Sequence, residues 1–358
     1  MMGGRAPTLS DVARSAGVSY ATADRVVNDR GGVADKSVRR VRSAIEQLGY
    51  VRNVAAANLS QGRTYRFAFI IPEGSNSFFA RVRTVLGESR VRLIPEQIEV
   101  QIEGVAAFDA EALAARLRRL AAESLDGVAL VGIDDSHVNA EIEALQQQGI
   151  AVLTLISDVI GEQRNGYVGV DNIVVGRTAG RLLALAHRGR PGRILPVIGS
   201  LSARDHAERL QGMTQTIAAA SPDLSLAPLI EGRDRHALVD EKLRAALAAD
   251  PAITAIYSAG AGNAGLIRVL EDLPPDMPRP TVILHELVAH SRHALEADLI
   301  DIVIDQRPED EIELALGYLR QLADRRPVPA PERIVPVIYV KDNLPPANGV
   351  LSEKGEMP

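Results

Sequence analysis

The sequence predicts an α/β protein in which a small all-α helix-turn-helix head precedes a larger, two-lobed body of parallel α/β structure. Two short helical periodicities separated by a glycine lie near the start of the chain. Apolar runs then alternate with amphipathic helices over residues 64–340. The length of 358 residues exceeds one ordinary domain of about 100–200 residues.

The first helix of the head is predicted to begin after Thr8, whose hydroxyl can accept a hydrogen bond from an early backbone amide. Asp11 would lie at the positive end of the helix dipole. The apolar residues that follow have helical spacing; they are Leu9, Val12, Ala13 and Ala16. Gly17 ends the helix, because glycine tolerates a left-handed turn.

A second helix is predicted to follow the cap Ser19, and a third to run from the cap Asp35 to Leu48. Ala23, Val26 and Val27 are predicted to lie on the buried side of the second helix. Two short helices joined by a tight, glycine-containing turn make a helix-turn-helix. The same pattern also fits a three-helix bundle that contacts another protein.

The outward side of the second helix carries residues suited to DNA. In a helix-turn-helix the start of this helix enters the major groove, where Arg25 could donate to a guanine and the Ala21 methyl could meet a thymine methyl. Tyr20 could contact a base. The short donors suited to phosphates are Ser19, Thr22, Asn28 and Ser37.

The net charge of −6 hides a division of charge along the chain. Residues 1–63 hold ten Lys/Arg and five Asp/Glu, whereas the remaining residues hold thirty and forty-one. A basic head on an acidic body is expected of a nucleic-acid module joined to another domain.

The run TLSDVARSAGVSYATADRVVNDRGGVADKSVRRVRSAIEQLGY resembles the head of the lactose-repressor (LacI/GalR) family of bacterial transcription regulators. The matching elements are DVA, AGVS, AT, RVVN and AIEQLGY, in the family's order and spacing. The resemblance implies that Tyr20, Ala21 and Arg25 read bases and that Ser19, Thr22, Asn28 and Ser37 contact phosphates. We also include Leu9 among the DNA-binding residues.

Residues 50–63 form an alanine-rich segment between residues 1–49 and the body. It is too short to be a stable helix alone, which suits a helix that forms only on DNA. The resemblance implies a hinge whose Leu59 wedges into the minor groove, with Asn53 and Ala56 beside it. An ordinary linker is the alternative. Asp24, Arg52 and Ala57 depart from the family pattern, which puts the operator sequence in doubt.

The body is predicted to contain parallel sheets covered by helices on both faces. The predicted strands are residues 65–71, 127–133, 150–156, 167–170, 193–198, 253–257, 281–284, 299–304 and 333–340. The clearest helices are 109–122, 138–148, 207–220, 237–249 and 309–325. Residues 64–340 exceed one such sheet, so two lobes are expected.

Ligands of open α/β sheets bind beyond the carboxyl ends of the strands, and polar side chains with one aromatic pair follow the predicted strands. Such groups suit a sugar, because carboxylates and amides pair with hydroxyls and a ring stacks on the C–H face. Helix capping is the alternative for any single residue. The predicted effector-binding residues are Asn76, Phe78, Phe79, Asp135, Ser157, Asp158, Arg204, Asp205, His206, Arg209, Asn263, Glu286 and Gln306.

The body is similar to the family's effector domain, which is related to periplasmic sugar-binding proteins. The matching segments are SNSFF, VGVDN followed by AG, ERLQGM, and the D-Q-x-P stretch at 305–308. The resemblance implies that Asn76 and Phe78 or Phe79 line the pocket. It also implies that the side chains in contact with sugar hydroxyls are those of Arg209, Glu286 and Gln306. The segment SAGAGN departs from the family, which implies a different pocket wall.

The composition argues against several other classes of protein. Cysteine is absent, which excludes disulfides, thiolate metal sites and a cysteine nucleophile. His137, His285 and His290 lack a tight metal-ligand spacing such as HExxH, and no GxSxG or GxxxxGK(S/T) motif occurs, so we expect no catalysis, metal or cofactor. No apolar run reaches the ~20 residues of a membrane span and no signal peptide is recognised, so we expect a cytoplasmic protein without membrane contact. A free-standing sugar-binding protein of the transport type is the alternative, which the basic head disfavours.

These features together predict a repressor controlled by a small polar effector, a sugar or sugar derivative, bound between the lobes. We expect a homodimer with its two heads on a palindromic double-stranded operator. Residues 341–358 lack leucine heptads and are expected to be a flexible tail.

Overall fold

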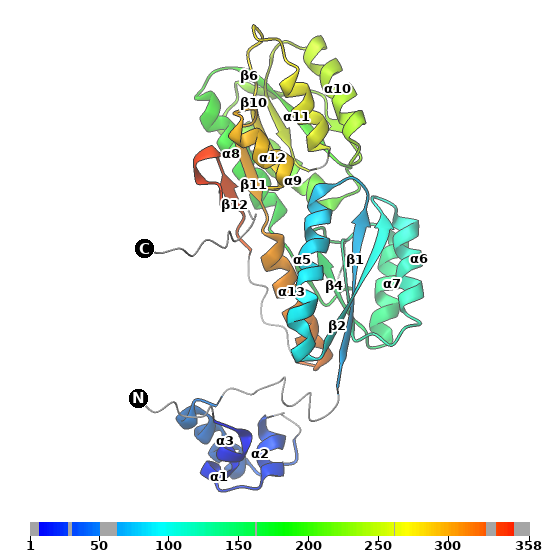
Figure 1. The fold of residues 1–358 in the computed structure, drawn as a ribbon, viewed down its shortest axis with the longest axis vertical. Helices are drawn as coiled ribbons and strands as arrows, with labels where there is room; N and C mark the ends of the chain where they lie inside the picture. Colours follow the sequence, from blue (N-terminus) through cyan, green and yellow to red (C-terminus); the bar gives the residue numbers. More distant parts are fainter. Residues whose placement is uncertain are drawn as a thin grey trace, which may run out of the picture. The chain divides into compact units, whose positions relative to one another are not determined.

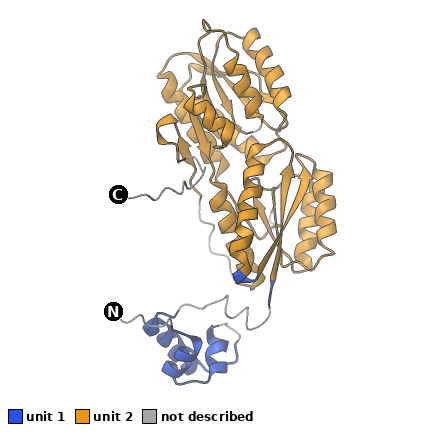
Figure 2. Ribbon diagram, viewed as in Figure 1, with its two compact units in different colours: residues 1–64, 95–97 blue, residues 65–94, 98–358 orange. Residues whose placement is uncertain are grey.

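The structure, a computed structural model, describes residues 7–27, 31–50, 63–161, 163–260, 262–326 and 334–346. The chain divides into two compact units, one of residues 1–64 with 95–97 and one of residues 65–94 with 98–358 (Figure 2). No helix in these ranges is both long and apolar enough to cross a bilayer.

The smaller unit contains three helices: α1 (Leu9–Ala16), α2 (Tyr20–Val27) and α3 (Asp35–Leu48) (Figure 1). Their apolar faces meet in one small core that includes Val12, Ala23 and Val41. Asp35 is the first residue of α3, and Ala34 holds the cap position without a side-chain bond. The prediction that Asp35 caps this helix is therefore wrong; its carboxylate lies in the first turn, where it favours the helix dipole.

The first lobe of the larger unit is a five-stranded parallel sheet with helices on both faces. Its strand order is β2-β1-β3-β4-β5. The strands are β1 (Tyr65–Glu73), β2 (Ile98–Ala106), β3 (Gly127–Leu130), β4 (Ala151–Leu155) and β5 (Gly166–Val168). Helices α5 (Ser77–Leu93) and α13 (Pro308–Ala323) cover one face, and α6 (Ala110–Leu120) and α7 (Ser136–Gln147) cover the other.

Strand β1 shows why the sequence of a central strand in this sheet is apolar at consecutive positions. Phe67, Phe69 and Ile71 pack into the core beneath α5 and α13, while Ala68 and Ile70 pack beneath α6 and α7. Alternate residues of a strand point to opposite faces, so a strand covered on both sides must be apolar at every position.

The second lobe repeats this order as β7-β6-β9-β10-β11, with β12 added antiparallel to β11 and β8 paired with β6. The strands are β6 (Gly192–Ile198), β7 (Leu224–Leu226), β8 (Ile230–Glu231), β9 (Ile253–Ser258), β10 (Thr281–His285), β11 (Ile302–Asp305) and β12 (Val337–Tyr339). Helices α8 (Asn172–His187) and α9 (Arg204–Ala220) cover one face, and α10 (His236–Ala249), α11 (Asn263–Glu271) and α12 (Ala289–Glu296) cover the other.

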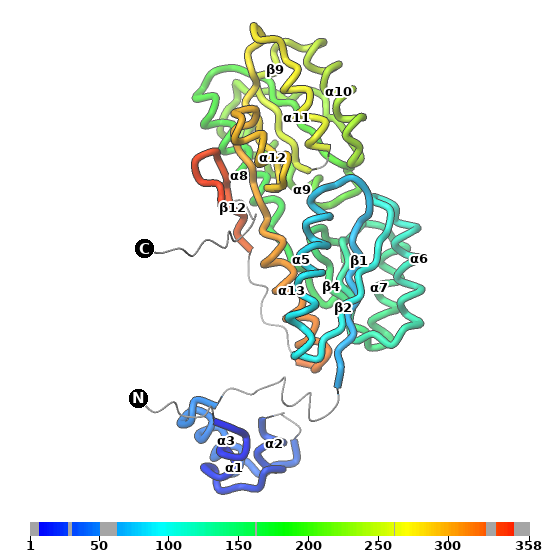
Figure 3. The backbone as a smooth tube through the Cα atoms, in the orientation of Figure 1, coloured from blue at the N-terminus to red at the C-terminus, as the bar shows by residue number. Residues whose placement is uncertain are grey.

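The chain passes between the lobes more than once, as the tube in Figure 3 shows. Strand β5 belongs to the first lobe and α8 to the second, and β11 of the second lobe leads to α13, which packs in the first. Helices α8 and α9 approach closely because their contact surface contains glycines. A Cβ on Gly176 would lie 2.1 Å from the Arg209 carbonyl oxygen, and one on Gly212 would lie 2.2 Å from the Ile173 carbonyl oxygen.

The predicted fold class and two-lobed parallel architecture are confirmed, but some elements were missed. Strands β2, β7 and β8 and helices α5, α8, α11 and α12 were not among the predicted elements. Residues 341–346, expected in a flexible tail, contain a 3-10 turn (Lys341–Asn343). Leu344 packs against the core of the second lobe, and Lys341 pairs with Asp298; the tail prediction is wrong for these residues.

Candidate ligand pocket and nucleic-acid interface

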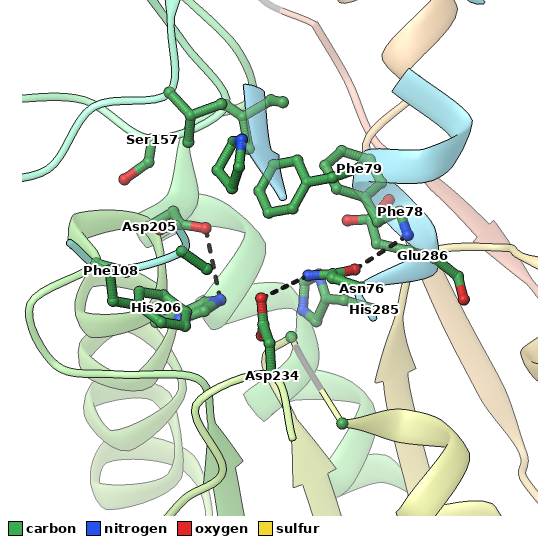
Figure 4. Close-up of a pocket in the computed structure, with 18 of the residues that line it drawn as sticks. Asn76, Phe78, Phe79, Phe108, Ser157, Asp205, His206, Asp234, His285 and Glu286 are labelled. Atoms are coloured by element: carbon green, nitrogen blue, oxygen red, sulfur yellow. Dashed lines mark hydrogen bonds and ion pairs between the residues drawn. The ribbon is translucent and has the colours of Figure 1, made fainter. Parts of the chain in front are cut away.

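A pocket lies at the carboxyl ends of the two sheets and is lined by residues of both lobes (Figure 4). It holds about 880 Å³ of space free of protein atoms, its open mouth included. In the first lobe, the order β2-β1-β3 makes the end of β1 and β3 a topological switch point, where such sheets bind ligands.

The first lobe supplies the apolar wall of the pocket. Phe78 and Phe79 lie side by side with ring centroids 5.4 Å apart, and Phe108 follows β2. Asn76 positions the aromatic pair, because its side-chain oxygen accepts a hydrogen bond from the Phe78 amide and caps α5. Ser157 also lines this wall, and its Oγ is buried without a hydrogen-bond partner.

The second lobe supplies the titratable wall, and Arg209 is the buried cation at its centre. Only 2% of Arg209 is exposed. Its Nε donates to Asn172 Oδ1 at 2.7 Å, and Nη1 donates to the Ala259 carbonyl at 2.9 Å. Nη2 donates to Gln306 Oε1 at 3.2 Å. These neutral acceptors fix the plane of the guanidinium group.

Two carboxyl groups in this wall each keep one oxygen without a partner. Glu286 Oε1 accepts a hydrogen bond from Gln306 Nε2 at 2.8 Å, whereas its Oε2 is buried and unpartnered. Asp234 Oδ2 accepts from Asn76 Nδ2 at 3.0 Å, whereas its Oδ1 is buried and unpartnered. A buried polar atom without a partner costs about 1–3 kcal/mol, which a donor on a bound ligand would recover.

The environment raises the pKa of both carboxyl groups. Burial, and then the charge of Asp305, raise the pKa of Glu286 to about 8. Burial also raises the pKa of Asp234 above its usual range, and the charge of Asp205 adds to this shift. Loss of water disfavours the ionised carboxylate, as does a neighbouring negative charge.

Histidines complete the polar wall. The Ser200 amide donates to Nδ1 of His206, whose Nε2 lies 3.7 Å from Asp205 Oδ2. His285 Nε2 lies 3.0 Å from the Tyr257 hydroxyl. Burial, followed by the charge of Arg209, holds the pKa of His285 well below its usual value, so its ring is neutral at physiological pH. No group of three His, Cys, Asp or Glu side chains suited to a metal ion occurs in the described part of the chain.

Strained backbone surrounds the pocket. Four of its lining residues that are not glycine have positive φ: Phe108 (58°), Ile156 (68°), Asp234 (56°) and Glu286 (71°). Positive φ is uncommon outside glycine and is a genuine outlier for a β-branched residue such as Ile156. Such strain persists only where the surrounding structure imposes it, and it clusters at ligand sites.

Hydrogen bonds join the lobes at the edge of the pocket. Ser75 Oγ donates to the Asp234 carbonyl oxygen at 2.8 Å, next to the bond between Asn76 and Asp234. His236 Nε2 lies 3.2 Å from the Ser75 carbonyl oxygen. Figure 4 shows Asp234 below Asn76, with a dashed line joining its carboxylate to the Asn76 side chain. Asp234 therefore contacts the first lobe with one oxygen and leaves the other for a ligand.

Ten of the thirteen predicted effector residues line this pocket. They are Asn76, Phe78, Phe79, Ser157, Asp205, His206, Arg209, Asn263, Glu286 and Gln306. Their contact with an effector stays a prediction. Asn263 is engaged by the protein itself, since Ser258 Oγ donates to its Oδ1 and its Nδ2 donates to the His285 carbonyl.

The other three predicted residues lie outside the pocket and have structural partners. Asp135 caps α7 by accepting a hydrogen bond from the His137 amide. Asp158 accepts from Thr154 Oγ1 and pairs with Arg164. Arg204 pairs with Glu208 and donates to the Val159 carbonyl. For these residues the capping and framework alternative describes the structure better.

The prediction missed Phe108, Asp234, His236 and His290, which also line the pocket. Phe108 follows β2 and Asp234 follows the two-residue β8. The strand-end rule that located the other residues would have located these two, had those strands been recognised.

The head presents a separate candidate surface for nucleic acid. Thr8 and Asp11 form a capping box at the start of α1, and Gly17 ends the helix with φ 58°. Ser19 Oγ accepts from the Thr22 amide at 3.1 Å and starts α2 as predicted. These features fix the turn between the two helices.

Helix α2 exposes the residues predicted to read bases. Tyr20 is 57% exposed, and Ala21 and Arg25 are also exposed, on the side away from the buried Ala23 and Val26. The phosphate candidate Ser19 is exposed; Thr22 and Ser37 are half-buried. Leu9 packs against the core of the head. The predicted contacts Asn28, Asn53, Ala56 and Leu59 lie outside the described residues.

Both units match known families of proteins. Residues 8–53 match the family described as bacterial regulatory proteins, lacI family. Residues 67–327 match the periplasmic binding protein domain.

Curated relatives match parts of both units. The HTH-type transcriptional regulator DegA of Bacillus subtilis is 25% identical over 236 residues, which cover 63% of this chain and 65% of DegA. The HTH-type transcriptional regulator CelR of Thermobifida fusca is 32% identical over 222 residues, 60% of this chain and 62% of CelR. The matched segments thus span just under two thirds of these relatives.

The larger unit also resembles solved structures. GanP, a glucose-galactose binding protein from Geobacillus stearothermophilus, superposes with a TM-score of 0.71 at 20% sequence identity. The superposition covers 79% of this chain and 99% of GanP. At this identity the likeness shows the fold alone.

Proposed function

We propose that this chain, which belongs to the periplasmic binding protein domain family and whose residues 8–53 match the lacI family of bacterial regulatory proteins, is a transcriptional regulator whose DNA affinity is set by a small polar effector. The observation that carries the proposal is the presence, in one chain, of an exposed helix-turn-helix surface and a pocket with unpartnered buried polar atoms. The head makes a free-standing sugar-binding protein the less favoured function.

Helix α2 is proposed to enter the major groove. Tyr20, Ala21 and Arg25 would contact base edges, since all three are exposed on one side of the helix. Ser19, Thr22, Asn28 and Ser37 would contact phosphates and set the register. Leu59, with Asn53 and Ala56, is proposed to act at the centre of the operator, and Leu9 remains a weaker candidate because it packs against the core of the head.

The effector is proposed to be a sugar or sugar derivative. The pocket combines phenylalanine rings on one wall with carboxyl, amide and guanidinium groups on the other, which matches the apolar C–H face and the polar rim of a pyranose. GanP, with the same fold, is described as a glucose-galactose binding protein. Arg209, Glu286 and Gln306 are proposed to contact hydroxyl groups, and Phe78 or Phe79 to stack on the ring.

Two chains are proposed to pair as a homodimer on a palindromic operator. In dimeric helix-turn-helix proteins each subunit binds one half-site, so the symmetry of the operator mirrors that of the protein. Effector binding would change DNA affinity only through a difference in affinity for two lobe arrangements. The bonds of Asp234 to Ser75 and Asn76 are suited to such a difference, because they join the lobes at the ligand site. We propose repression relieved by the effector, in the cytoplasm, without catalysis.

DNA binding is tested by fluorescence anisotropy with DNA from the region upstream of the gene and its neighbours. Binding is expected to weaken steeply as salt rises, because lysine and arginine release counterions from phosphates. Salt-insensitive binding, or none on any upstream fragment, would refute the regulator proposal.

Effector binding is tested by thermal-shift measurements over a panel of sugars, since a ligand of the native state raises the midpoint. At least one sugar is expected to stabilise the protein, and Arg209→Lys is expected to abolish the shift because lysine lacks the planar fork. Arg244→Lys is the matched control, since Arg244 pairs with Asp240 and Asp272 at the surface. A shift that survives Arg209→Lys unchanged would refute the role of Arg209.

A further inference from the structure

Carboxyl groups outnumber guanidinium and ammonium groups among the described residues that line the pocket. Four histidines also line it, and burial lowers the pKa of two of them, His285 and His290. The described residues that line it include three carboxyl groups, those of Asp205, Asp234 and Glu286. Arg209 is their only guanidinium group, and no lysine is present among them. All of these groups come from the second lobe, so they face the ligand from one side.

Three of the five N–H groups of the Arg209 guanidinium are already used by the protein. Each of its three nitrogens donates to an oxygen of the protein, on Asn172, Ala259 and Gln306. Phosphate and carboxylate sites usually offer a pair of parallel N–H groups or several cations. Here the one cation is held by neutral acceptors and balances the surrounding carboxyl groups.

The unpartnered carboxyl oxygens also oppose an anion. Asp234 Oδ1 and Glu286 Oε2 are buried and have no hydrogen-bond partner. A hydroxyl or ammonium group can donate to Asp234 Oδ1, whereas a phosphate or carboxylate oxygen there would add another acceptor beside the carboxyl groups of Asp234 and Asp205. Burial raises the pKa of Glu286 to about 8, so Glu286 is mostly protonated at neutral pH and contributes hydrogen bonding rather than negative charge.

Helix N-termini, which attract anions, are partly neutralised at this site. Asn76 caps α5 by accepting from the Phe78 amide, and Asp205 lies in the first turn of α9. Helices α10 and α11 start near the pocket without a side-chain cap. The backbone amides at these two helix starts would attract an anion, and the proposal requires the nearby carboxyl groups to outweigh that attraction.

We propose that the pocket selects against anions, so that its effector is a polyol or amino polyol without a phosphate or carboxylate group. This inference rests on the proposed sugar effector and narrows it to a charge class. Neutral sugars would use their hydroxyl groups as donors to Asp234 and as hydrogen-bond partners of Glu286. An amino sugar would present its ammonium group to Asp234.

The proposal is tested by isothermal titration calorimetry of the full chain with matched sets of sugars. Each set contains one skeleton in four forms: the neutral sugar, its amino form, its phosphate and its uronic acid, with glucose, galactose and arabinose as the first skeletons wherever the form exists. We expect the best neutral or amino ligand to bind at least ten-fold more tightly than its phosphate and its uronic acid. An anionic form that binds as tightly as, or more tightly than, its neutral counterpart would overturn the proposal.

The failure of this inference can be told apart from failure of the proposed function. If an anion is preferred, the chain is still a sugar-responsive regulator, but its charge selectivity is not the one inferred here. If no sugar of any charge binds, the sugar effector itself is refuted and this inference falls with it.

Two isosteric changes locate the selectivity. Asp234→Asn combined with Glu286→Gln removes both ionisable carboxyl groups while preserving shape, and is expected to reduce the preference for neutral over phosphorylated forms several-fold. Asp272→Asn removes a surface carboxylate of the same lobe, which is 55% exposed and paired with Arg244, and should leave the preference unchanged. If the double variant and the native chain show the same preference for neutral forms, these carboxyl groups are not its source. If the double variant does not fold, the comparison of neutral and anionic sugars on the native chain still decides whether the pocket selects against anions.

Discussion

Replacing Glu286 by glutamine is expected to stabilise the protein at alkaline pH and to change its stability much less near pH 5. Glu286 is buried, and burial followed by the charge of Asp305 raises the pKa of its carboxyl to about 8, from an ordinary value of 4.5. The folded state therefore holds the proton more tightly than the unfolded state. This contribution to stability is complete below pH 4.5 and is lost as pH rises toward 8.

The magnitude follows from these two values. Between pH 5 and pH 9 the native chain is expected to lose about 4 kcal/mol of unfolding free energy through this one group. Glutamine cannot ionise, and its amide oxygen can still accept the hydrogen bond that Gln306 Nε2 donates to Oε1. The free energy of unfolding of Glu286→Gln minus that of the native chain should therefore grow by about 4 kcal/mol over this range.

The assay is urea unfolding of the full chain followed by circular dichroism, since the sequence contains no tryptophan. Comparing variant with native chain at each pH cancels the titration of all other groups. Glu296→Gln is the matched control, because Glu296 is about half exposed and pairs with Arg292 on the surface. A difference between Glu286→Gln and the native chain that is the same at pH 5 and pH 9 would refute the reasoning.

Three further predictions follow from other contacts. Gly176→Ala should lower the free energy of unfolding by at least about 1–3 kcal/mol through overpacking, because its Cβ would lie 2.1 Å from the Arg209 carbonyl oxygen. Gly317→Ala, whose Cβ would meet no atom within 4 Å, should instead raise the free energy of unfolding by about 0.5–1 kcal/mol by stabilising α13. Thermal unfolding distinguishes them, and equal effects would contradict the packing argument. Asn76→Asp should keep the cap of α5 but place a carboxylate against Asp234, weakening effector binding in calorimetry about ten-fold or more; unchanged affinity would show that this bond does not support the bound state. Arg25→Ala should cost about 1–3 kcal/mol of specific DNA affinity in anisotropy without lowering the melting temperature, since Arg25 is exposed; a loss of stability instead would assign Arg25 to the fold.

The fold was predictable where burial controls the sequence pattern. Strand β1 is apolar at consecutive positions because both faces are covered, and its run from Phe67 to Ile71 is conspicuous. Strand β2 lies at the sheet edge and alternates apolar Ile98 and Val100 with polar Glu99 and Gln101. A search for continuous apolar runs passes over such a strand, and with it the Phe108 that follows.

The site was predictable to the extent that strand ends were placed correctly. Strand β3 ends at Leu130, before the predicted end at residue 133, so the chain has left the sheet edge by the time it reaches Asp135. Asp135 therefore caps α7. The backbone turns at Ile156, which has a positive φ, and Asp158 lies outside the pocket. No sequence pattern predicts a positive φ at an isoleucine. Asp234 depends on β8, which has two residues and leaves too little pattern to detect.

The division of the pocket between two lobes has a consequence for how this protein can change. All the titratable groups that line the pocket within the described residues belong to one lobe, and the phenylalanine rings belong to the other. In the proposed regulator, recognition of ligand shape and recognition of ligand charge would therefore lie in different lobes, which have separate hydrophobic cores. Substitutions around Phe79 and Phe108 can alter which skeleton fits while the charge preference persists, and changes at Asp234 or Glu286 can do the reverse. Ligand shape and ligand charge can therefore be altered separately, by substitutions in the first lobe and in the second lobe.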